Sequence, residues 1–378
     1  MAKILKISQV KSMLWVSIST LRRWDKNGKL TSFRVWGLWH RMYLESDVNA
    51  LLERSKIPEN QDFLWKFRFI DLFAWVGWFH HAFAEIGGDC VHACEIDKYA
   101  RSTYFANFKI DEHQFSKDIT TLKAEEIPDH DILTWGFPCQ AFSIAWYRRG
   151  FNDSRWNLFF DVARIIEHKK PKAIMLENVK NLVAHDQGKT FKIILETLTS
   201  LWYFVKTKVL NSCEYGGIPQ NRERIYIVWF LSELAFRKFK FPEKIELKAS
   251  VKTLLEKNVW DTFSYNNKPL YEKLKDFVTN ENTVYQWRRQ YVRENKKGVV
   301  PTLTANMGTW WHNVPIVLEN GCIRKLTPKE CFRAQGFPEN IVLPPIANSH
   351  LYKQAWNAVS VPVVKRVGIE ILRALSEA

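Results

Sequence analysis

Glycine and cysteine are both scarce in this chain, which has 15 glycines and 6 cysteines among 378 residues. Average proteins contain about 7% glycine, so the chain falls well short of the usual number. The cysteines have neither the paired spacing of a zinc site nor the density of a disulfide framework, which excludes both kinds of scaffold. Most are expected to be small core residues. The six are Cys90, Cys94, Cys139, Cys213, Cys322 and Cys331.

Long apolar runs are also missing. Although 46% of the residues are hydrophobic, no apolar segment has the length needed to cross a bilayer. The first residues lack the succession of basic, apolar and small residues of a signal peptide. We therefore expect a soluble protein of two or three domains that works in the cytoplasm.

Positive charge is in excess and unevenly distributed. The 55 lysines and arginines outnumber the 40 acidic residues by 15, and residues 1–58 and 233–315 hold all but two of these excess charges. Clustered positive charge suits a polyanion such as nucleic acid, because neutralising phosphates releases condensed counterions. A lysine-rich soluble surface would give the same balance, so charge alone leaves both interpretations open.

Residues 1–58 are expected to form a small helix-turn-helix DNA-binding domain. Two helical patterns, at 6–16 and 19–30, are separated by a short turn. The second pattern presents Arg22, Arg23 and Lys26 on an exposed face that suits a DNA groove. The stretch from 17 to 30 resembles the excisionase and MerR-type DNA-binding domains. A small helical packing domain is the other interpretation.

Beyond a polar, proline-containing linker at 55–66, strand-like and helix-like patterns alternate up to about residue 232. Such alternation predicts an α/β fold with a doubly wound, mostly parallel sheet covered by helices. From 233 to 315 the pattern gives way to a lysine-rich stretch that we interpret as a separate, recognition-type domain. The expected strands lie at 67–73, 90–97, 131–135, 172–179, 203–211 and 224–230.

Polar motifs lie at the ends of these strands. A Pro-Cys-Gln turn that contains Cys139 comes directly after the strand at 131–135, and Glu177 lies at the end of the strand at 172–179. Arg222 and Arg224 are two residues apart, which puts them on one side of an extended segment. Open α/β sheets bind ligands at the carboxyl ends of their strands, so these side chains are candidates for an active site.

Together and in this order, the motifs resemble those of the DNA (cytosine-5) methyltransferase family, and the resemblance extends from residue 67 to 378. It includes IDLFAWVGWF at 70–79, RKLTPKECFRAQGFP at 324–338 and QAWNAVSVPVV at 354–364. The resemblance implies a catalytic domain at 67–232, an inserted target-recognition domain at 233–315 and a C-terminal return at 316–378. It also implies site-specific methyl transfer from S-adenosyl-L-methionine to C5 of cytosine in double-stranded DNA.

The resemblance assigns roles to four catalytic residues. C5 of cytosine is a poor nucleophile, so a thiolate, here that of Cys139, must first add to C6 of a base turned out of the duplex. Glu177 would meet the N3 and N4 edge of the base and supply a proton to N3 as the thiolate adds. Arg222 and Arg224 would hold the O2 side and brace the cysteine loop.

The resemblance also implies contacts with the cofactor and with DNA, and no metal. Glu95 would bind the ribose hydroxyls and Asp118 the adenine amino group. The expected cofactor residues are Phe73, Trp75, Gly77, Glu95, Ile96, Asp118, Ile119, Leu158, Asn357 and Val359. The expected DNA contacts, besides those of the N-terminal domain, are Gln140 and a loop that closes over the duplex, with Ser143, Arg148, Arg149 and Arg155.

Other functions fit parts of the sequence. A transcription regulator could bind DNA through its first 58 residues and keep an inactive methyltransferase body as a scaffold. An RNA methyltransferase of the same lineage is disfavoured because the segment 233–315 is large enough for duplex readout. A dinucleotide-dependent oxidoreductase shares only the outline of the loop at 70–79. A cognate restriction endonuclease is the partner that a restriction-modification role would require.

Tryptophan is abundant, with 17 residues, and most of them stand where the family pattern has glycine. Replacing thirteen by glycine would bring glycine to about 7% of the chain, the average for proteins. Our hypothesis is that the source cell reads UGA as glycine and that this sequence renders it as tryptophan. A degenerate protein is the alternative. The thirteen are Trp15, Trp36, Trp39, Trp75, Trp78, Trp135, Trp146, Trp156, Trp202, Trp229, Trp310, Trp311 and Trp356.

Overall fold

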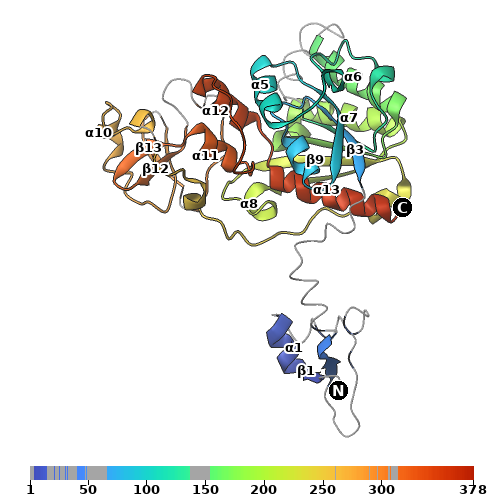
Figure 1. Cartoon of the computed structure of the whole chain (residues 1–378), viewed down its shortest axis with the longest axis horizontal. Helices are drawn as coiled ribbons and strands as arrows, with labels where there is room; N and C mark the ends of the chain where they lie inside the picture. The colour runs from blue at the N-terminus through green and yellow to red at the C-terminus, as the bar shows by residue number, and fades with distance from the viewer. Residues whose placement is uncertain are drawn as a thin grey trace. The chain divides into compact units, whose positions relative to one another are not determined.

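The chain consists of two compact units, Met1–Leu64 and Trp65–Ala378. The computed structural model describes residues 66–136 and 154–378 except 260, 289, 296, 305–306 and 308–313. In the first unit it describes 4–14, 41–46 and a few single residues between and after them. Both units are drawn in Figure 1.

In the described part of the first unit, two short strands lie beside a helix. Strands β1 (Ile4–Lys6) and β2 (Met42–Leu44) are antiparallel, and helix α1 (Ile7–Leu14) follows β1 directly. The helix agrees with the pattern at 6–16, whereas no sequence pattern predicted the strands. Arg22, Arg23 and Lys26 lie outside the described residues, so the helix-turn-helix stays a prediction. The buried core comprises Leu5, Val10, Leu21, Leu30, Tyr43 and Val48.

A seven-stranded sheet forms the centre of the second unit, in the order β5-β4-β3-β6-β7-β9-β8. Strand β9 is antiparallel to both of its neighbours, and the other pairings are parallel. All six strands expected from the sequence are present, which confirms the doubly wound, mostly parallel sheet. The strands are β3 (Phe67–Leu72), β4 (Gly88–Cys94), β5 (Phe115–Ser116), β6 (Ile132–Trp135), β7 (Ala173–Val179), β8 (Phe204–Asn211) and β9 (Glu223–Phe230).

Helices cover both faces of this sheet (Figure 1). Helices α6 (Ser154–Lys169) and α7 (Lys189–Ser200) pack with β3, β6, β7 and β9 in one continuous apolar core. Helices α4 (Trp78–Ala84) and α13 (Val361–Ser376) pack against one another on the other face. A Cβ on Gly368 of α13 would lie 2.8 Å from the Phe83 ring of α4, so glycine allows this close approach.

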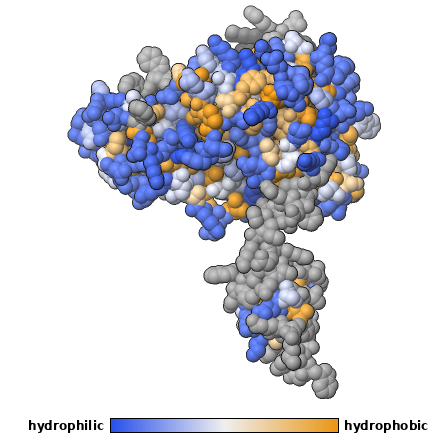
Figure 2. Space-filling model, in the orientation of Figure 1, coloured by the Kyte–Doolittle hydropathy of each residue, from blue (hydrophilic) through white to orange (hydrophobic). Residues whose placement is uncertain are grey.

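Shorter helices connect these elements. They are α5 (Lys98–Asn107), α8 (Ser212–Tyr215) and α9 (Glu233–Lys238), with the 3-10 segments η2 (Glu112–Gln114), η3 (Ala124–Glu126) and η6 (Lys180–Gly188). Among the described residues, no helix combines the length and the apolarity needed to span a bilayer. Hydrophilic residues dominate the visible face, with apolar residues in smaller areas between them (Figure 2).

A second, antiparallel sheet of four strands lies in the region that follows, in the order β11-β10-β12-β13. Its strands are β10 (Tyr285–Trp287), β11 (Val292–Glu294), β12 (Ile316–Glu319) and β13 (Cys322–Lys325). Its short helical segments are η7 (Val251–Leu254), η8 (Asp261–Phe263) and α10 (Tyr271–Leu274). The small sheet therefore takes strands from both sides of residue 315, the domain boundary expected from the sequence. That boundary stays a prediction.

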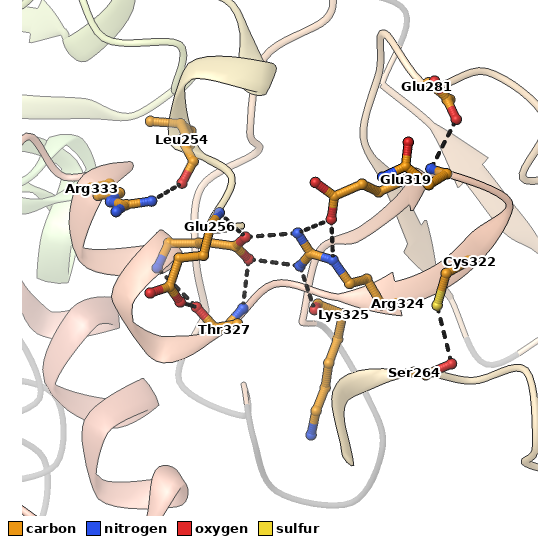
Figure 3. A network of polar contacts seen from close by, with 12 residues as sticks. Leu254, Glu256, Ser264, Glu281, Glu319, Cys322, Arg324, Lys325, Thr327 and Arg333 are labelled. Atoms are coloured by element: carbon orange, nitrogen blue, oxygen red, sulfur yellow. Dashed lines mark hydrogen bonds and ion pairs between the residues drawn. The ribbon is translucent and has the colours of Figure 1, made fainter. Parts of the chain in front are cut away.

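A buried ion pair connects this small sheet to helix α11 (Pro328–Arg333) (Figure 3). The guanidinium of Arg324 on β13 donates to both carboxylate oxygens of Glu330, at 2.9 and 2.7 Å. The same carboxylate accepts the backbone N–H groups of Glu256 and Thr327, each at 2.8 Å. Both charged side chains are nearly inaccessible. Arg324 also pairs with the partly exposed Glu319, at 2.7 Å, so two carboxylates compensate the buried guanidinium.

We expect Glu330→Gln to destabilise the protein by about 2–3 kcal/mol, because it weakens charge-assisted hydrogen bonds of a buried carboxylate and leaves Arg324 only the partly exposed Glu319 as a countercharge. The matched control is Glu272→Gln, which breaks an exposed pair with Lys275 at 2.6 Å and should cost at most about 1 kcal/mol. Urea unfolding of both variants measures the difference. If both variants lost the same free energy of unfolding, the buried pair would contribute no more to stability than the exposed pair does.

Candidate active site

The parallel strands of the large sheet end at one edge. Strands β3, β4, β6 and β7 run in the same direction, so their carboxyl ends lie together. Strand β9 runs the other way, and its second residue, Arg224, pairs with Val179 at the end of β7. The beginning of β9 therefore lies at the same edge. This is the edge where α/β proteins bind ligands.

The turn between β3 and α4 has an unusual backbone. Phe73, Trp75 and Gly77 have positive φ values of 57°, 52° and 84°, and glycine alone adopts such values at little cost. The N–H of Gly77 donates to the Ala74 carbonyl at 2.7 Å and closes the turn. A Cβ on Gly77 would collide with the ring of Phe108, so packing also requires glycine there.

Glu95 follows β4 and is fixed by two backbone N–H groups. One carboxylate oxygen accepts the N–H of Asp97 at 2.7 Å, and the other accepts that of Trp75 at 2.9 Å. Burial raises the pKa of Glu95, and the two N–H donors oppose this shift. Each oxygen can still accept a second hydrogen bond, which suits a pair of neighbouring hydroxyl groups. Beside it, Ile96 is 69% exposed and offers an apolar surface.

Three further expected cofactor residues lie around this edge. Asp118 is half-buried, and one of its oxygens accepts both the N–H and the hydroxyl of Thr120, at 2.9 and 2.8 Å. Ile119 is buried in the core that includes Leu72. Leu158, in the first turns of α6, is partly buried against the same core. Asp118 is therefore the polar group of the three.

Glu177 and Arg224 form a buried ion pair across β7 and β9. Arg224 Nε lies 3.1 Å from Glu177 Oε1, and both side chains are almost inaccessible. Burial raises the pKa of Glu177, while the nearby Arg224 and Arg222 counteract the rise. The carboxyl group therefore keeps its proton to a higher pH than an exposed glutamate does. Such a group can donate a proton to a bound base.

Arg222 ties the C-terminal return to the active-site edge. Its Nη2 donates to the carbonyls of Trp356 and Ala358, at 3.1 and 2.5 Å. Asn357 stands between these two carbonyl groups and buried Val359 follows them, so both expected cofactor residues lie next to Arg222. Its Nε and Nη1 are buried without a hydrogen-bond partner among the described residues, and burial lowers the pKa of Arg222.

Several expected site residues fall outside this description. Strand β6 leads into Gly136, after which Cys139, Gln140, Ser143, Arg148 and Arg149 lie outside the described residues. Arg155 lies in α6, where only its backbone is described. The structure thus places Glu95, Glu177, Arg222 and Arg224 at one edge of the sheet, and the roles of all the expected site residues stay predictions.

Two glutamines were not singled out from the sequence. Gln354 in helix α12 (Asn348–Asn357) donates to the Tyr99 carbonyl at 2.8 Å and accepts the Thr103 hydroxyl at 2.8 Å, which fixes α12 against α5. Gln220 is fully buried, and both polar atoms of its amide lack a partner among the described residues. Both residues belong to motifs that carried the family resemblance, and position within those motifs was the available signal.

No group of three or more histidine, cysteine, aspartate or glutamate side chains in the described part of the chain could hold a metal ion. The polar groups at this edge are instead carboxylates and guanidinium groups. Their arrangement suits proton transfer to a planar base and binding of a hydroxyl-bearing ligand.

The sequence profile of the C-5 cytosine-specific DNA methylase family matches residues 67–373. The chain belongs to this family. It therefore transfers a methyl group from S-adenosyl-L-methionine to C5 of cytosine in DNA. The expected enzyme class and cofactor are confirmed, and the comparisons do not support an inactive scaffold.

Curated relatives of this methyltransferase are similar over most of their length. The Type II methyltransferase M.Bsp6I of Bacillus sp. (strain RFL6) is 49% identical over 80% of the chain and 98% of the relative. M.HhaI of Haemophilus parahaemolyticus is 39% identical over 82% of the chain and 95% of the relative. M1.ScrFI of Lactococcus lactis subsp. cremoris is 38% identical over 93% of the chain and 90% of the relative.

Solved structures of similar fold include the Entamoeba histolytica methyltransferase EhMeth, with a TM-score of 0.62 and 18% identity over 82% of the chain and 99% of that structure. Spodoptera frugiperda DNMT2 gives a TM-score of 0.62 and 20% identity over 81% of the chain and 99% of that structure. At these identities the likeness establishes the fold of the methyltransferase.

The residues at the edge fit S-adenosyl-L-methionine in part. The fixed carboxylate of Glu95 and the exposed side chain of Ile96 suit a ribose and an adenine ring. The side chain of Trp75 fits less well, because it extends from the turn that should approach the cofactor and donates from Nε1 to the Gln354 carbonyl at 3.1 Å.

The raised pKa of Glu177 gives a pH dependence of stability with a definite sign. Between the ordinary glutamate pKa and the raised one, the folded state holds a proton that the unfolded state has released. Stability is therefore lost as the pH rises through this window. Glu177→Gln removes this titration, so the stability of the variant relative to the parent should rise as the pH increases through the window.

Thermal melts of both proteins at several pH values test this expectation. The control is Glu196→Gln, which removes an exposed ion pair with Lys192. The difference in melting temperature between this variant and the parent should not change with pH. The raised pKa of Glu177 would be contradicted if the difference in melting temperature between Glu177→Gln and the parent stayed constant with pH. It would also be contradicted if the melting temperature of the variant fell relative to the parent as the pH rose.

Proposed function

We propose that the enzyme methylates cytosine within a specific duplex sequence through a covalent bond between Cys139 and C6 of a base turned out of the helix. The observation that carries this proposal is the buried ion pair between Glu177 and Arg224. Strand β6, whose neighbour along the edge is β7, leads toward the Pro-Cys turn. A nucleophile supplied from that turn would face the acid of β7.

The proposed chemistry balances as an addition followed by an elimination. The Cys139 thiolate adds to C6 while Glu177 supplies a proton to N3, which gives C5 the electron density of an enamine. The cofactor supplies an electrophilic methyl group, which becomes bonded to C5 as its bond to the sulfonium sulfur breaks and leaves a thioether. A base such as water takes the C5 proton, the N3 proton returns to Glu177, and the thiolate departs from C6, which restores the aromatic ring.

Arginines support the charge changes in this sequence. Arg222 and Arg224 hold the O2 side of the base, and the unpartnered Nε and Nη1 of Arg222 are available as donors. Cofactor contacts are assigned to Glu95, Ile96 and Asp118 at the ends of their strands, with Phe73, Gly77, Ile119, Leu158, Asn357 and Val359 around them. Trp75 occupies a position in this set at which glycine would fit better.

DNA recognition is assigned to two parts of the chain. The segment 233–315 carries part of the positive excess and acts as the target-recognition domain, which is the direct-readout element of the enzyme. The loop at 143–155, with Ser143, Arg148, Arg149 and Arg155, closes over the duplex and, with Gln140, stabilises the flipped base.

The N-terminal unit is proposed to be an additional DNA reader that uses Arg22, Arg23 and Lys26. The alignment with M1.ScrFI supports its place in such an enzyme, because 93% of the chain is more than residues 67–378 can supply. We propose that the enzyme works in the cytoplasm as the protective half of a restriction-modification system, beside a cognate endonuclease. The same helix-turn-helix could regulate the genes of that system.

We expect Cys139→Ser to abolish methyl transfer and to leave the binding of DNA and cofactor largely intact, since a hydroxyl lacks the acidity that addition to C6 needs. The measurements are tritiated methyl incorporation into duplex DNA and a gel-shift titration. Cys213→Ser, a free cysteine of the described region, is the matched control. Full activity of the Cys139→Ser variant would remove Cys139 from the mechanism.

Deleting residues 1–58 should leave the methylated sequence unchanged and remove binding to a second, promoter-like DNA site. The catalytic motifs begin only at residue 67, so the smaller unit is dispensable for catalysis in this account. Methylation maps and footprints of both proteins make the comparison, with an Arg22→Ala/Arg23→Ala variant as the control that keeps the domain. Loss of site choice in the truncated enzyme would place target recognition partly in the first unit.

A further inference from the structure

Trp202 occupies a backbone position that helices usually give to glycine. Helix α7 ends at Ser200, Leu201 is its C-cap, and Trp202 follows with a φ of 69°. The N–H of Trp202 donates to the Thr199 carbonyl at 2.9 Å, and that of Tyr203 to the Leu198 carbonyl at 3.2 Å. This pair of hydrogen bonds is the Schellman ending, whose left-handed residue is typically glycine because glycine has no Cβ.

The indole of Trp202 does not compensate for this conformation. The residue is 83% exposed, so its ring buries little apolar surface. A residue that has a Cβ is strained in the left-handed region of backbone φ and ψ, and it stays there only when its surroundings hold it. Trp202 therefore combines the backbone of a glycine with the side chain least suited to it.

Trp75 repeats the combination at the active-site edge. Its φ is 52°, and its backbone N–H donates to Glu95 from the turn between β3 and α4. Its ring extends to helix α12, where Lys353 Nζ lies 5.4 Å from the ring centroid. The large side chain therefore stands beside the carboxylate that is assigned to the cofactor.

Trp78 shows a different anomaly at the same edge. It is 4% exposed, and its indole N–H has no hydrogen-bond partner among the described residues. Buried indole N–H groups normally find an acceptor. Its ring comes within 3.5 Å of the point where a Cβ on Gly136 would stand, so it fills space at the end of β6.

Trp287 shows how an ordinary tryptophan of this protein behaves. It lies in strand β10, is 7% exposed and belongs to the apolar core of the small sheet. Lys273 Nζ lies 5.8 Å from its ring centroid. Trp75, Trp78 and Trp202 differ from it in backbone or in unmet hydrogen bonding, and the sequence has too few glycines and 17 tryptophans.

We infer that the working enzyme carries glycine at positions 75, 78 and 202, and that its gene specifies them by a codon that the source cell reads as glycine. UGA fits, because different genetic codes assign it to different residues. Glycine at 75 and 78 removes two indoles from the edge that holds Glu95. Position 202 precedes β8 at the opposite edge of the sheet, so that part of the inference is independent of the proposed function.

Mass spectrometry of the protein isolated from cells that carry the gene is the direct test. Trypsin releases a peptide from Ile193 to Lys206 that contains position 202, and one from Phe69 to Lys98 that contains positions 75 and 78. We expect glycine masses in both peptides and a tryptophan mass at 287. Tryptophan at 75, 78 and 202 would overturn the inference.

Two variants of the tryptophan-containing chain test the backbone argument at an exposed position. Trp202→Gly and Trp202→Ala both remove the indole, but only glycine removes the Cβ that makes a φ of 69° unfavourable. Trp202→Gly should therefore melt about 1–3 °C above Trp202→Ala. An alanine variant as stable as the glycine variant would contradict a requirement for glycine at this position.

The active-site positions are tested by cofactor binding. The double change Trp75→Gly with Trp78→Gly should tighten S-adenosyl-L-methionine binding at least about tenfold in calorimetric titration, whereas Trp202→Gly should leave the affinity unchanged. Equal affinities of the double variant and the parent would show that the two indoles do not obstruct the edge. The peptide masses decide the inference even if the double variant folds poorly.

Discussion

The reversed direction of β9 beside β7 is the constraint on which the active site depends. A fully parallel sheet would put the beginning of β9 at the opposite edge, far from the carboxyl ends of β3, β4 and β6. Because β9 is antiparallel, Arg224 reaches Glu177 at 3.1 Å, and Arg222 stands two residues away at the same edge. Acid and cations meet there because of topology, since their motifs are more than forty residues apart in sequence.

The same edge of the sheet joins the beginning of β9 to the C-terminal return. Arg222 donates to two carbonyl groups that lie more than 130 residues further along the chain, so the C-terminal return is fixed to the beginning of β9. At the small sheet, Arg324 and Glu330 do the same for α11 and the segment around Glu256. Each junction uses a buried guanidinium group, whose several donors can satisfy acceptors from separate segments.

The sequence predicted the large sheet well because its long strands, apart from the largely exposed β8, are buried apolar runs between turn signals. It missed β5, which has two residues, and the pairing of β12 with β10 across residue 315. Short antiparallel pairings depend on tertiary contacts that leave little local pattern. Motif order located Glu95, Glu177, Arg222 and Arg224, but not the carbonyl partners of Arg222, because backbone acceptors carry no sequence signature.

The central claim is that Glu177 and its arginines serve a nucleophile at Cys139. A duplex that contains 5-fluorocytosine at the target position tests it most directly, because fluorine replaces the C5 proton whose loss releases the enzyme. Incubation with S-adenosyl-L-methionine, followed by proteolysis and mass spectrometry, should find the base attached to Cys139 and to no other cysteine. An adduct on another residue, or turnover without an adduct, would contradict the account.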